Sequence, residues 1–323
     1  MEGFRQGMQR LILHGGAGSI PSSRAPEVER GLRAALESGW SRMDHATDAV
    51  EAAIQSMEGS GIFDAGLGSV LNLKGRVEMD AALMTHELEV GAVAGLTRTA
   101  HPIAVARQVM EKTPHVLLAG PGADRFARAL GFPPVRIRPP RRVAVYQDLR
   151  RRLEASVASR GKANDRDPMD PARPDWWPRL QSLVSEHPEL LHGTVGAVAL
   201  DAQGRLTAGT STGGITLKME GRVSDSCLPG CGTYADRTVG VSCTGTGEVI
   251  IRHTLARSVA ETLRTSGLTL DQAVRRALRP LPRGTAGLIA LDRKGHFGWG
   301  RNTENLAFAF RSDRSSSPVF RMA

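Results

Sequence analysis

The chain has 323 residues, enough for one large α/β unit or about two average domains. Apolar residues make up 41% and charged residues 23%, as in ordinary globular proteins, and no apolar run reaches the roughly 18 residues of a membrane span. Three cysteines are too few for a disulfide framework, and residues 1–10 lack the apolar stretch of a secretory signal, so we expect a cytoplasmic protein.

The first 135 residues alternate short apolar strands with amphipathic helices. We expect a strand at Leu11–Leu13 that leads into a glycine-rich loop, and a strand–turn–strand unit over 69–82. Apolar residues recur at helical spacing in four segments, and in two of them a proline stands in the first turn. The expected helices cover 26–40, 46–57, 102–111 and 122–130.

A basic segment follows. The net charge is +9, and seven arginines fall between positions 136 and 152. Residues 141–159 are expected to form a basic helix, whereas 160–174 contains almost no apolar side chains that could offset its ordering entropy. We interpret 136–190 as a solvated linker. Aromatic residues are only 4%, and no RNA-binding or helix-turn-helix motif accompanies the charge, so charge alone names no partner.

The C-terminal part contains two apolar hairpins. Residues 194–200 are expected to pair with 205–210, and residues 287–291 with 296–300. Helices are expected at 248–266 and 270–278. Because the hairpin turns are short, the pattern favours antiparallel sheets covered by helices over a doubly wound parallel fold.

Most familiar chemical motifs are absent, but hydroxyls and glycines are dense. The chain has no dinucleotide fingerprint, no P-loop and no His-Glu-x-x-His, and three thiols (Cys227, Cys231, Cys243) are one ligand short of a structural zinc site. Thr194 begins the first C-terminal hairpin, and hydroxyl–glycine clusters end later strands. Hydrolysis by a hydroxyl without a histidine base needs another base, and an N-terminal threonine supplies its own α-amine.

These motifs resemble the plant-type L-asparaginases, also called isoaspartyl peptidases, within the N-terminal-nucleophile hydrolases. Several motifs recur in the family's order and similar spacing, over nearly the whole chain outside 136–190. They are His14-Gly-Gly-Ala-Gly18, Gly66-Leu-Gly-Ser69, Glu78-Met-Asp-Ala81, Gly91-Ala-Val-Ala-Gly95, the segment 192–201, Ser211-Thr-Gly-Gly214, Gly221-Arg-Val223, Asp225-Ser226, Gly232-Thr-Tyr-Ala235 and Ser242-Cys-Thr-Gly-Thr-Gly247.

The resemblance implies a four-layer αββα sandwich with antiparallel central sheets, made as an inactive precursor. It implies self-cleavage at Gly193-Thr194 into chains 1–193 and 194–323 that remain one structural unit. Thr194 would be the nucleophile and Thr212 would orient its hydroxyl. The implied oxyanion and substrate-binding residues are Thr244, Gly245, Arg222 (for the α-carboxylate) and Asp225 (for the α-ammonium).

The resemblance also implies a dimer of cleaved heterodimers, with no cofactor needed for the chemistry. A structural sodium ion would be held by backbone carbonyls of Met57, Glu58, Ser60, Phe63, Ala65 and Leu67. The chain departs from the family at Asp64, where an asparagine is expected, which exchanges an amide with donors for an acceptor-only carboxylate. Cys227 and Cys231 are additional thiols beside the substrate-binding loop.

Three hypotheses follow from the sequence. The first is an amidohydrolase that converts β-aspartyl dipeptides, L-asparagine or both to aspartate, with no nucleic-acid or membrane partner. The second is a threonine protease that acts on a protein, although the pair Arg222 and Asp225 suits a free amino-acid end better. The third is a non-catalytic, basic nucleic-acid-binding protein, which salt-dependent retention on nucleic acid would reveal.

Overall fold

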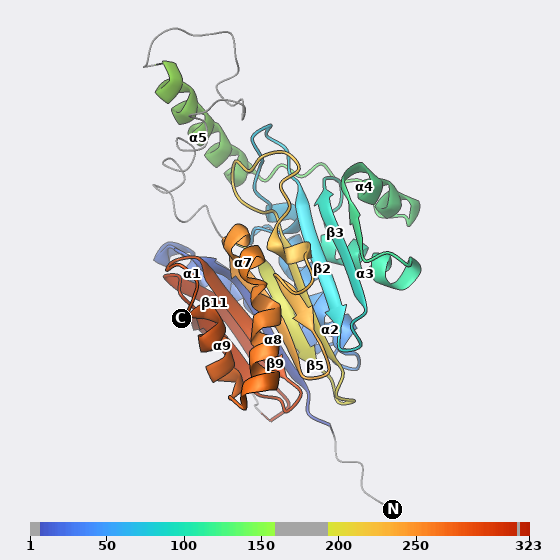
Figure 1. Cartoon of the computed structure of the whole chain (residues 1–323). Coiled ribbons are helices and arrows are strands. Elements are labelled where there is room, and N and C mark those ends of the chain that lie inside the picture. Colours follow the sequence, from blue (N-terminus) through green and yellow to red (C-terminus); the bar gives the residue numbers. More distant parts are fainter. Residues whose placement is uncertain (1–6, 159–192, 315–316) are drawn as a thin grey trace, which may run out of the picture.

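Two facing sheets with helices on their outer sides make up the computed structural model, which describes residues 7–158, 193–314 and 317–323 (Figure 1). The strands are β1 (Arg10–Gly18), β2 (Met79–Thr85), β3 (Val90–Leu96), β4 (Leu117–Ala119), β5 (Val195–Leu200), β6 (Leu206–Thr212), β7 (Thr233–Ala235), β8 (Val239–Gly245), β9 (Ala286–Asp292), β10 (Phe297–Arg301), β11 (Asn305–Ser312) and β12 (Val319–Met322). The helices are α1 (Ala25–Trp40), α2 (Ala46–Ser60), α3 (Pro102–Lys112), α4 (Gly120–Ala129), α5 (Pro140–Ala158), α7 (Gly247–His253), α8 (Leu255–Ser266) and α9 (Leu270–Leu278).

The larger sheet has the strand order β12-β11-β1-β5-β6-β2-β3-β4, and the smaller sheet has the order β10-β9-β8-β7. Neighbouring strands are antiparallel except β3 and β4. Helices α1, α2 and α3 cover the outer face of the larger sheet, and α8 and α9 cover the smaller one (Figure 1). Both expected hairpins form, as β5–β6 and β9–β10, and the prediction of antiparallel sheets covered by helices is confirmed.

Both faces of the central strands are buried, because one meets the helices and the other meets the second sheet. On β1, Leu11 and Leu13 join the core beneath α1 and α2, whereas Ile12 joins the core that includes the second sheet. Side chains alternate along a strand, so His14 lies on the same face as Ile12. Polar residues at such inward positions are therefore cut off from water.

The strand–turn–strand unit expected over 69–82 is wrong in its first half. Only Met79–Thr85 forms a strand, and it pairs with β3 and β6. The Asn72 side-chain carbonyl accepts hydrogen bonds from the N–H groups of Lys74 and Arg76, at 2.9 and 3.0 Å. This local turn uses backbone donors that a strand would need for its ladder.

The basic segment is not a linker over its whole length. Residues 140–158 form α5, whose Tyr146, Leu149 and Leu153 are buried in the core beside the larger sheet. The Tyr146 hydroxyl donates to the Leu73 carbonyl at 3.1 Å. The remainder of the proposed linker, from 159 to 190, lies outside the described residues.

The single helix expected over 248–266 is divided at Thr254. This residue adopts a left-handed conformation, with φ of 43°, between α7 and α8. Periodicity alone missed the break, since the apolar spacing continues on both sides of it.

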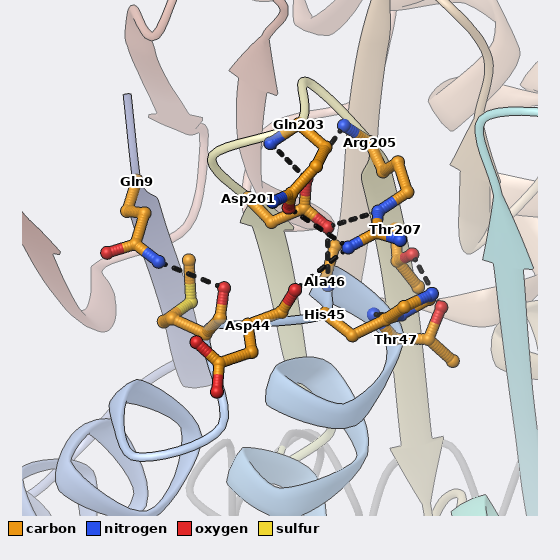
Figure 2. A network of polar contacts seen from close by, with 10 residues as sticks. Gln9, Asp44, His45, Ala46, Thr47, Asp201, Gln203, Arg205 and Thr207 are labelled. Atoms are coloured by element: carbon orange, nitrogen blue, oxygen red, sulfur yellow. Dashed lines mark hydrogen bonds and ion pairs between the residues drawn. The ribbon is translucent and has the colours of Figure 1, made fainter. Parts of the chain in front are cut away.

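The turn between β5 and β6 anchors the start of α2 (Figure 2). Asp201 is 1% exposed, and its carboxylate accepts hydrogen bonds from the N–H groups of Ala46, Gln203 and Arg205, each at 3.0 Å. Arg205 Nε also donates to Asp201 Oδ2 at 2.6 Å, and Arg205 Nη2 donates to the Asp44 carbonyl at 2.8 Å. One buried carboxylate thus joins a hairpin turn to α2, the helix that packs against β5 and β6.

We expect Asp201→Ala to lower the free energy of unfolding by about 2–3 kcal/mol, because it leaves buried backbone donors unpaired and removes a helix-start contact. Urea denaturation measures the change. The matched control is Asp271→Ala, whose pair with Arg275 is exposed and screened by solvent, so its loss should be much smaller. Equal losses for the two variants would contradict the anchoring role.

Candidate active site

The expected nucleophile lies directly before β5, a central strand of the larger sheet. Thr194 is 8% exposed, and its Oγ1 donates to Thr212 Oγ1 at 3.0 Å. The Gly214 N–H also donates to Thr212 Oγ1, at 2.9 Å, which fixes the orientation of that hydroxyl. Two hydroxyls that lie 18 positions apart in sequence therefore meet, and their roles stay a prediction.

The peptide bond before Thr194 is tightly enclosed. The Asp64 N–H donates to the Gly193 carbonyl at 3.2 Å, and a Cβ on Gly193 would lie 2.4 Å from Asp64 Cβ. On the other side, a Cβ on Gly16 would approach Gly193 Cα to 3.0 Å. Only glycine fits at position 193, and its carbonyl already has one backbone donor.

Asp64 occupies the expected place beside this bond with a carboxyl in place of an amide. Its Oδ1 accepts from the Val70 N–H at 2.9 Å. Burial raises the pKa of the Asp64 carboxyl, while Arg142 and the hydrogen bond from Val70 act in the opposite direction. The contact with Gly193 that the structure provides comes from the Asp64 backbone, which aspartate and asparagine share.

Thr244 and Gly245 end β8 on the opposite sheet. The Ala17 N–H donates to Thr244 Oγ1 at 3.2 Å, so this oxygen is an acceptor there and its own hydrogen is available to another group. Gly245 has φ of 142°, and a Cβ at that position would lie 2.1 Å from the Thr285 carbonyl oxygen. Ala17, which contacts Thr244, follows Gly16, which packs against Gly193. Thr244 therefore lies on the same side of the sheet interface as the Gly193-Thr194 bond.

Arg222 and Asp225 converge above the first residue of α7. A Cβ on Gly247 would lie 2.6 Å from Arg222 Nη2 and 2.8 Å from Asp225 Oδ1. The Arg222 side chain is held by Glu248, whose Oε1 accepts from Arg222 Nε at 2.9 Å. A cation and a carboxylate are thus side by side in a space that any side chain at position 247 would fill.

Both members of this pair have unsatisfied polar atoms. Arg222 Nη2 and Asp225 Oδ2 are buried without a hydrogen-bond partner among the described residues, although Nη2 lies 2.9 Å from Glu248 Oε1 in a poorly aligned ion pair. Burial raises the pKa of Asp225 to about 7, despite the opposing charge of Arg222. A free donor on a cation and a free acceptor on a carboxylate are complementary to a zwitterion.

Acidic residues before and within β2 hold the loop that carries Arg222. Asp80 accepts from the N–H groups of Gly95 and Ser224 at 2.8 and 2.7 Å, and Glu78 accepts from the Gly221 N–H at 3.1 Å. Lys218 is buried beside them and donates to the Glu78 carbonyl at 2.6 Å, and its burial lowers its pKa. Glu78 and Asp80 belong to the motif Glu78-Met-Asp-Ala81, but no role was predicted for them from the sequence.

The residues expected to bind sodium lie where α2 ends. Met57, Glu58 and Ser60 are in the final turn of α2, where carbonyls lack a backbone partner within the helix, and the Met57 carbonyl accepts from Ser60 Oγ at 2.7 Å. Cβ atoms on Gly66 and Gly68 would lie 2.6 and 2.1 Å from the carbonyl oxygens of Glu58 and Phe63. The remaining carbonyls of the set are Ala65 and Leu67. Carbonyl oxygens are ligands that an alkali cation prefers, but the Ala65 carbonyl already accepts from the Gly68 N–H at 3.1 Å, and the sodium site stays a prediction.

The three cysteines are free and buried. Burial raises the pKa of all three thiols, which keeps them in the protonated form. Within the described ranges, no three His, Cys, Asp or Glu side chains form a cluster that could hold a metal. No helix in the same ranges is long and apolar enough to cross a membrane.

Comparison with known proteins places the chain in a family. A family model described as asparaginase matches residues 7–320. A plant-type L-asparaginase of Thermococcus kodakarensis is 42% identical over 318 residues, covering 96% of this chain and 99% of the relative. An isoaspartyl peptidase of Salmonella typhimurium is 36% identical over 330 residues, with coverages of 96% and 98%.

A Danio rerio protein named isoaspartyl peptidase/L-asparaginase is 39% identical over 295 residues, which cover 88% of this chain and 86% of that protein. The range matched by the family model extends over both sheets and includes every residue of the site described above. The resemblance seen in the sequence motifs is confirmed, and the chain belongs to the asparaginase family that includes the plant-type L-asparaginases and isoaspartyl peptidases.

Proposed function

We propose that this protein is a threonine amidohydrolase that cleaves itself between Gly193 and Thr194 and then hydrolyses L-asparagine and β-aspartyl dipeptides to aspartate. The observation that carries the proposal is the Thr194–Thr212 hydroxyl pair at 3.0 Å. Names of the relatives support both substrates. The layer order supports assignment to the four-layer αββα fold of N-terminal-nucleophile hydrolases.

Self-cleavage begins with the Thr194 hydroxyl. Its oxygen adds to the Gly193 carbonyl carbon, and the proton passes to the Thr194 nitrogen as the C–N bond breaks. The Asp64 N–H stabilises the negative charge that develops on the Gly193 oxygen. Water hydrolyses the resulting ester, which leaves a carboxylate on Gly193 and a free α-amine on Thr194.

In the mature enzyme this amine is the general base. It removes the proton from the Thr194 hydroxyl, whose oxygen attacks the side-chain amide carbon of the substrate. The Thr244 hydroxyl and the Gly245 N–H stabilise the oxyanion, a contribution of roughly 3–4 kcal/mol per donor. The protonated amine gives its proton to the leaving nitrogen, and water then releases aspartate from the Thr194 ester.

Substrate selection depends on Arg222 and Asp225. The guanidinium pairs with the α-carboxylate and the Asp225 carboxylate pairs with the α-ammonium, which gives hydrogen-bond partners to Arg222 Nη2 and Asp225 Oδ2, two atoms that have none among the described residues. A residue inside a polypeptide carries neither charge, so the pair favours a free aspartyl end over a protein substrate. A cation held by the carbonyls of 57–67 would stabilise the loop that carries Asp64, and no step of the reaction passes through it. The dimer of cleaved heterodimers remains a prediction.

Thr194→Ala is expected to abolish self-cleavage, because no hydroxyl is left to attack the Gly193 carbonyl. Intact-mass measurement should find a single chain of 34.6 kDa for the variant and two fragments, 1–193 and 194–323, for the unaltered protein. Thr194→Ser, which keeps the hydroxyl, is the control and should be cleaved. Cleaved chains in the alanine variant would end the assignment of the nucleophile.

Arg222→Lys should raise KM for L-asparagine about 10- to 100-fold while self-cleavage proceeds. An ammonium cannot reproduce the two-point contact of a guanidinium, and cleavage involves no substrate carboxylate. Steady-state kinetics on fully cleaved protein measure KM. The control, Arg237→Lys, alters an exposed arginine 3.9 Å from Glu87 and should leave KM unchanged. Loss of cleavage with unchanged KM would make Arg222 a structural residue.

The KM for L-asparagine should depend on pH through Asp225. Because burial raises its folded pKa to about 7, the carboxyl is neutral below that pH and charged above it, with Arg222, Glu248 and Asp80 as its charged neighbours. Only the charged form attracts the α-ammonium, so KM should rise up to about tenfold per unit as pH falls below 7 and should be constant above about pH 8. Asp225→Asn should give a high, pH-independent KM, and a constant KM in the unaltered protein down to about pH 5.5 would refute this role.

A further inference from the structure

His14 contacts the nucleophile residue in a way that the proposed mechanism does not use. The β1–β5 ladder ends at the pair His14–Gly196, so the Thr194 carbonyl lies beyond its last backbone pair. The His14 side chain takes the place of a backbone donor there, with Nδ1 3.1 Å from the Thr194 carbonyl oxygen. His14 is 0% exposed, so no water competes for this contact.

The protonation state of His14 follows from its surroundings. Burial lowers its pKa to about 3, although the contact with Thr194 acts in the opposite direction, so the imidazole is neutral in the physiological range. A neutral ring carries one N–H, and a carbonyl oxygen can only accept. The hydrogen is therefore on Nδ1, and Nε2 must accept from Ser242 Oγ, which lies 2.9 Å away.

The same reasoning fixes the direction of a longer chain of hydroxyls. The Ser242 hydrogen is used by His14, so the 2.7 Å contact between Ser242 and Thr210 is donated by Thr210. The single Thr210 hydrogen is shared between Ser242 Oγ and the more distant Gly232 carbonyl, 3.2 Å away, so the 2.6 Å contact with Thr233 is donated by Thr233. The shortest contacts of the series are thus donated toward the Thr194 carbonyl, an arrangement in which each bond polarises the next.

The chain runs between the two sheets and ends at the substrate-binding loop. The Thr233 hydroxyl shares its one hydrogen between Thr210 Oγ1, at 2.6 Å, and the carbonyl of Ser226, the residue after Asp225, at 3.0 Å. Gly196 leaves room for the chain, because a Cβ there would lie 1.9 Å from Ser242 Oγ and 2.5 Å from His14 Nε2. All four members are buried, with exposures of 0%.

We propose that His14 is a positioning residue for the nucleophile, oriented by Ser242, Thr210 and Thr233, and that this chain sets the main chain of Thr194 relative to the turn that binds the substrate ammonium. The inference rests on the proposed function, because its consequence is a property of the Thr194 hydroxyl and of the amine that cleavage releases. His14 transfers no proton. It holds the Thr194 carbonyl, and through it the reacting groups on either side of the same Cα.

The test compares Ser242→Ala with Thr207→Val. Thr207 is on β6, the strand that carries Thr210, is 1% exposed and pairs its hydroxyl with Thr47 at 3.1 Å (Figure 2). On fully cleaved protein, Ser242→Ala should lower kcat about 10- to 100-fold with KM for L-asparagine nearly unchanged, since misplacing a reacting atom affects the chemical step. Thr207→Val should match the unaltered protein in kcat. A kcat for Ser242→Ala equal to that of Thr207→Val overturns the proposal.

Thermal melting confirms that the compared variants are folded. Should Ser242→Ala not fold, the near-isosteric Thr210→Val replaces it, and a kcat loss beyond that of Thr207→Val supports the chain while equality overturns it. The pH profile separates positioning from proton transfer. The acid limb of kcat should keep its midpoint in Ser242→Ala, whereas a displaced midpoint would mean that His14 takes part in the proton transfer and would overturn the positioning role.

Failure of the proposed function has a different signature. If the unaltered, cleaved protein hydrolyses neither L-asparagine nor a β-aspartyl dipeptide, the function is wrong whatever the variants do. The positioning role is then judged by the half-time of conversion of the precursor into its fragments, followed by mass. Ser242→Ala should lengthen this half-time relative to Thr207→Val, and equal half-times would overturn the role.

Discussion

The site depends on one constraint: its polar groups lie between two sheets, where every hydrogen bond must be made within the protein. A buried polar group without a partner costs about 1–3 kcal/mol. His14, Thr194, Thr210, Ser242 and Thr244 all have partners, drawn from strands of both sheets. The need to pair these groups fixes the spacing of the sheets at this point as firmly as apolar packing does elsewhere.

The exceptions to complete pairing are concentrated where a ligand would bind. Four of the unpaired buried side-chain atoms in the described chain belong to residues 222–226, among them Arg222 Nη2 and Asp225 Oδ2. The other five belong to Glu58, Ser69, Thr85, His101 and Arg311. Glu78 and Asp80 hold the backbone of the loop that carries residues 222–226 through the N–H groups of Gly221 and Ser224. The loop is therefore not free to rearrange so that its polar atoms pair. A group of such atoms within one short loop is typical of a functional site.

Much of the fold was accessible from sequence, because its signals are local. The helix over 270–278 has a capping box at Thr269 and an apolar face of period 3.6, and both hairpins have short polar turns between alternating strands. The strand predicted before position 79 is absent. The apolar alternation there is that of a strand, but the Asn72 side chain closes a turn. Periodicity describes which face is buried, but it does not reveal competition for backbone hydrogen bonds.

The catalytic residues were predictable only in part. Thr194, Thr212, Arg222 and Asp225 came from family motifs, and their mutual contacts needed the structure. Glu248 as the partner of Arg222, and Ser242 as the partner of His14, join residues 26 and 228 positions apart. A pattern of hydroxyls at every second position, as in Thr210-x-Thr212 and Ser242-x-Thr244, was the available signal that these strands share a polar inner face.

The strand order has a consequence for the unfolding and refolding of the protein after cleavage at Gly193-Thr194. In the larger sheet, β1 from the first fragment lies between β11 and β5 of the second, and β6 of the second pairs with β2 of the first. The fragments are interleaved, so neither can leave without breaking ladders on both sides of β1. The nicked protein would behave as one cooperative unit, and after unfolding it would have to reassemble by a bimolecular reaction that the intact precursor never faces. Maturation would thus be a one-way step, with folding completed first and the covalent link then dispensable.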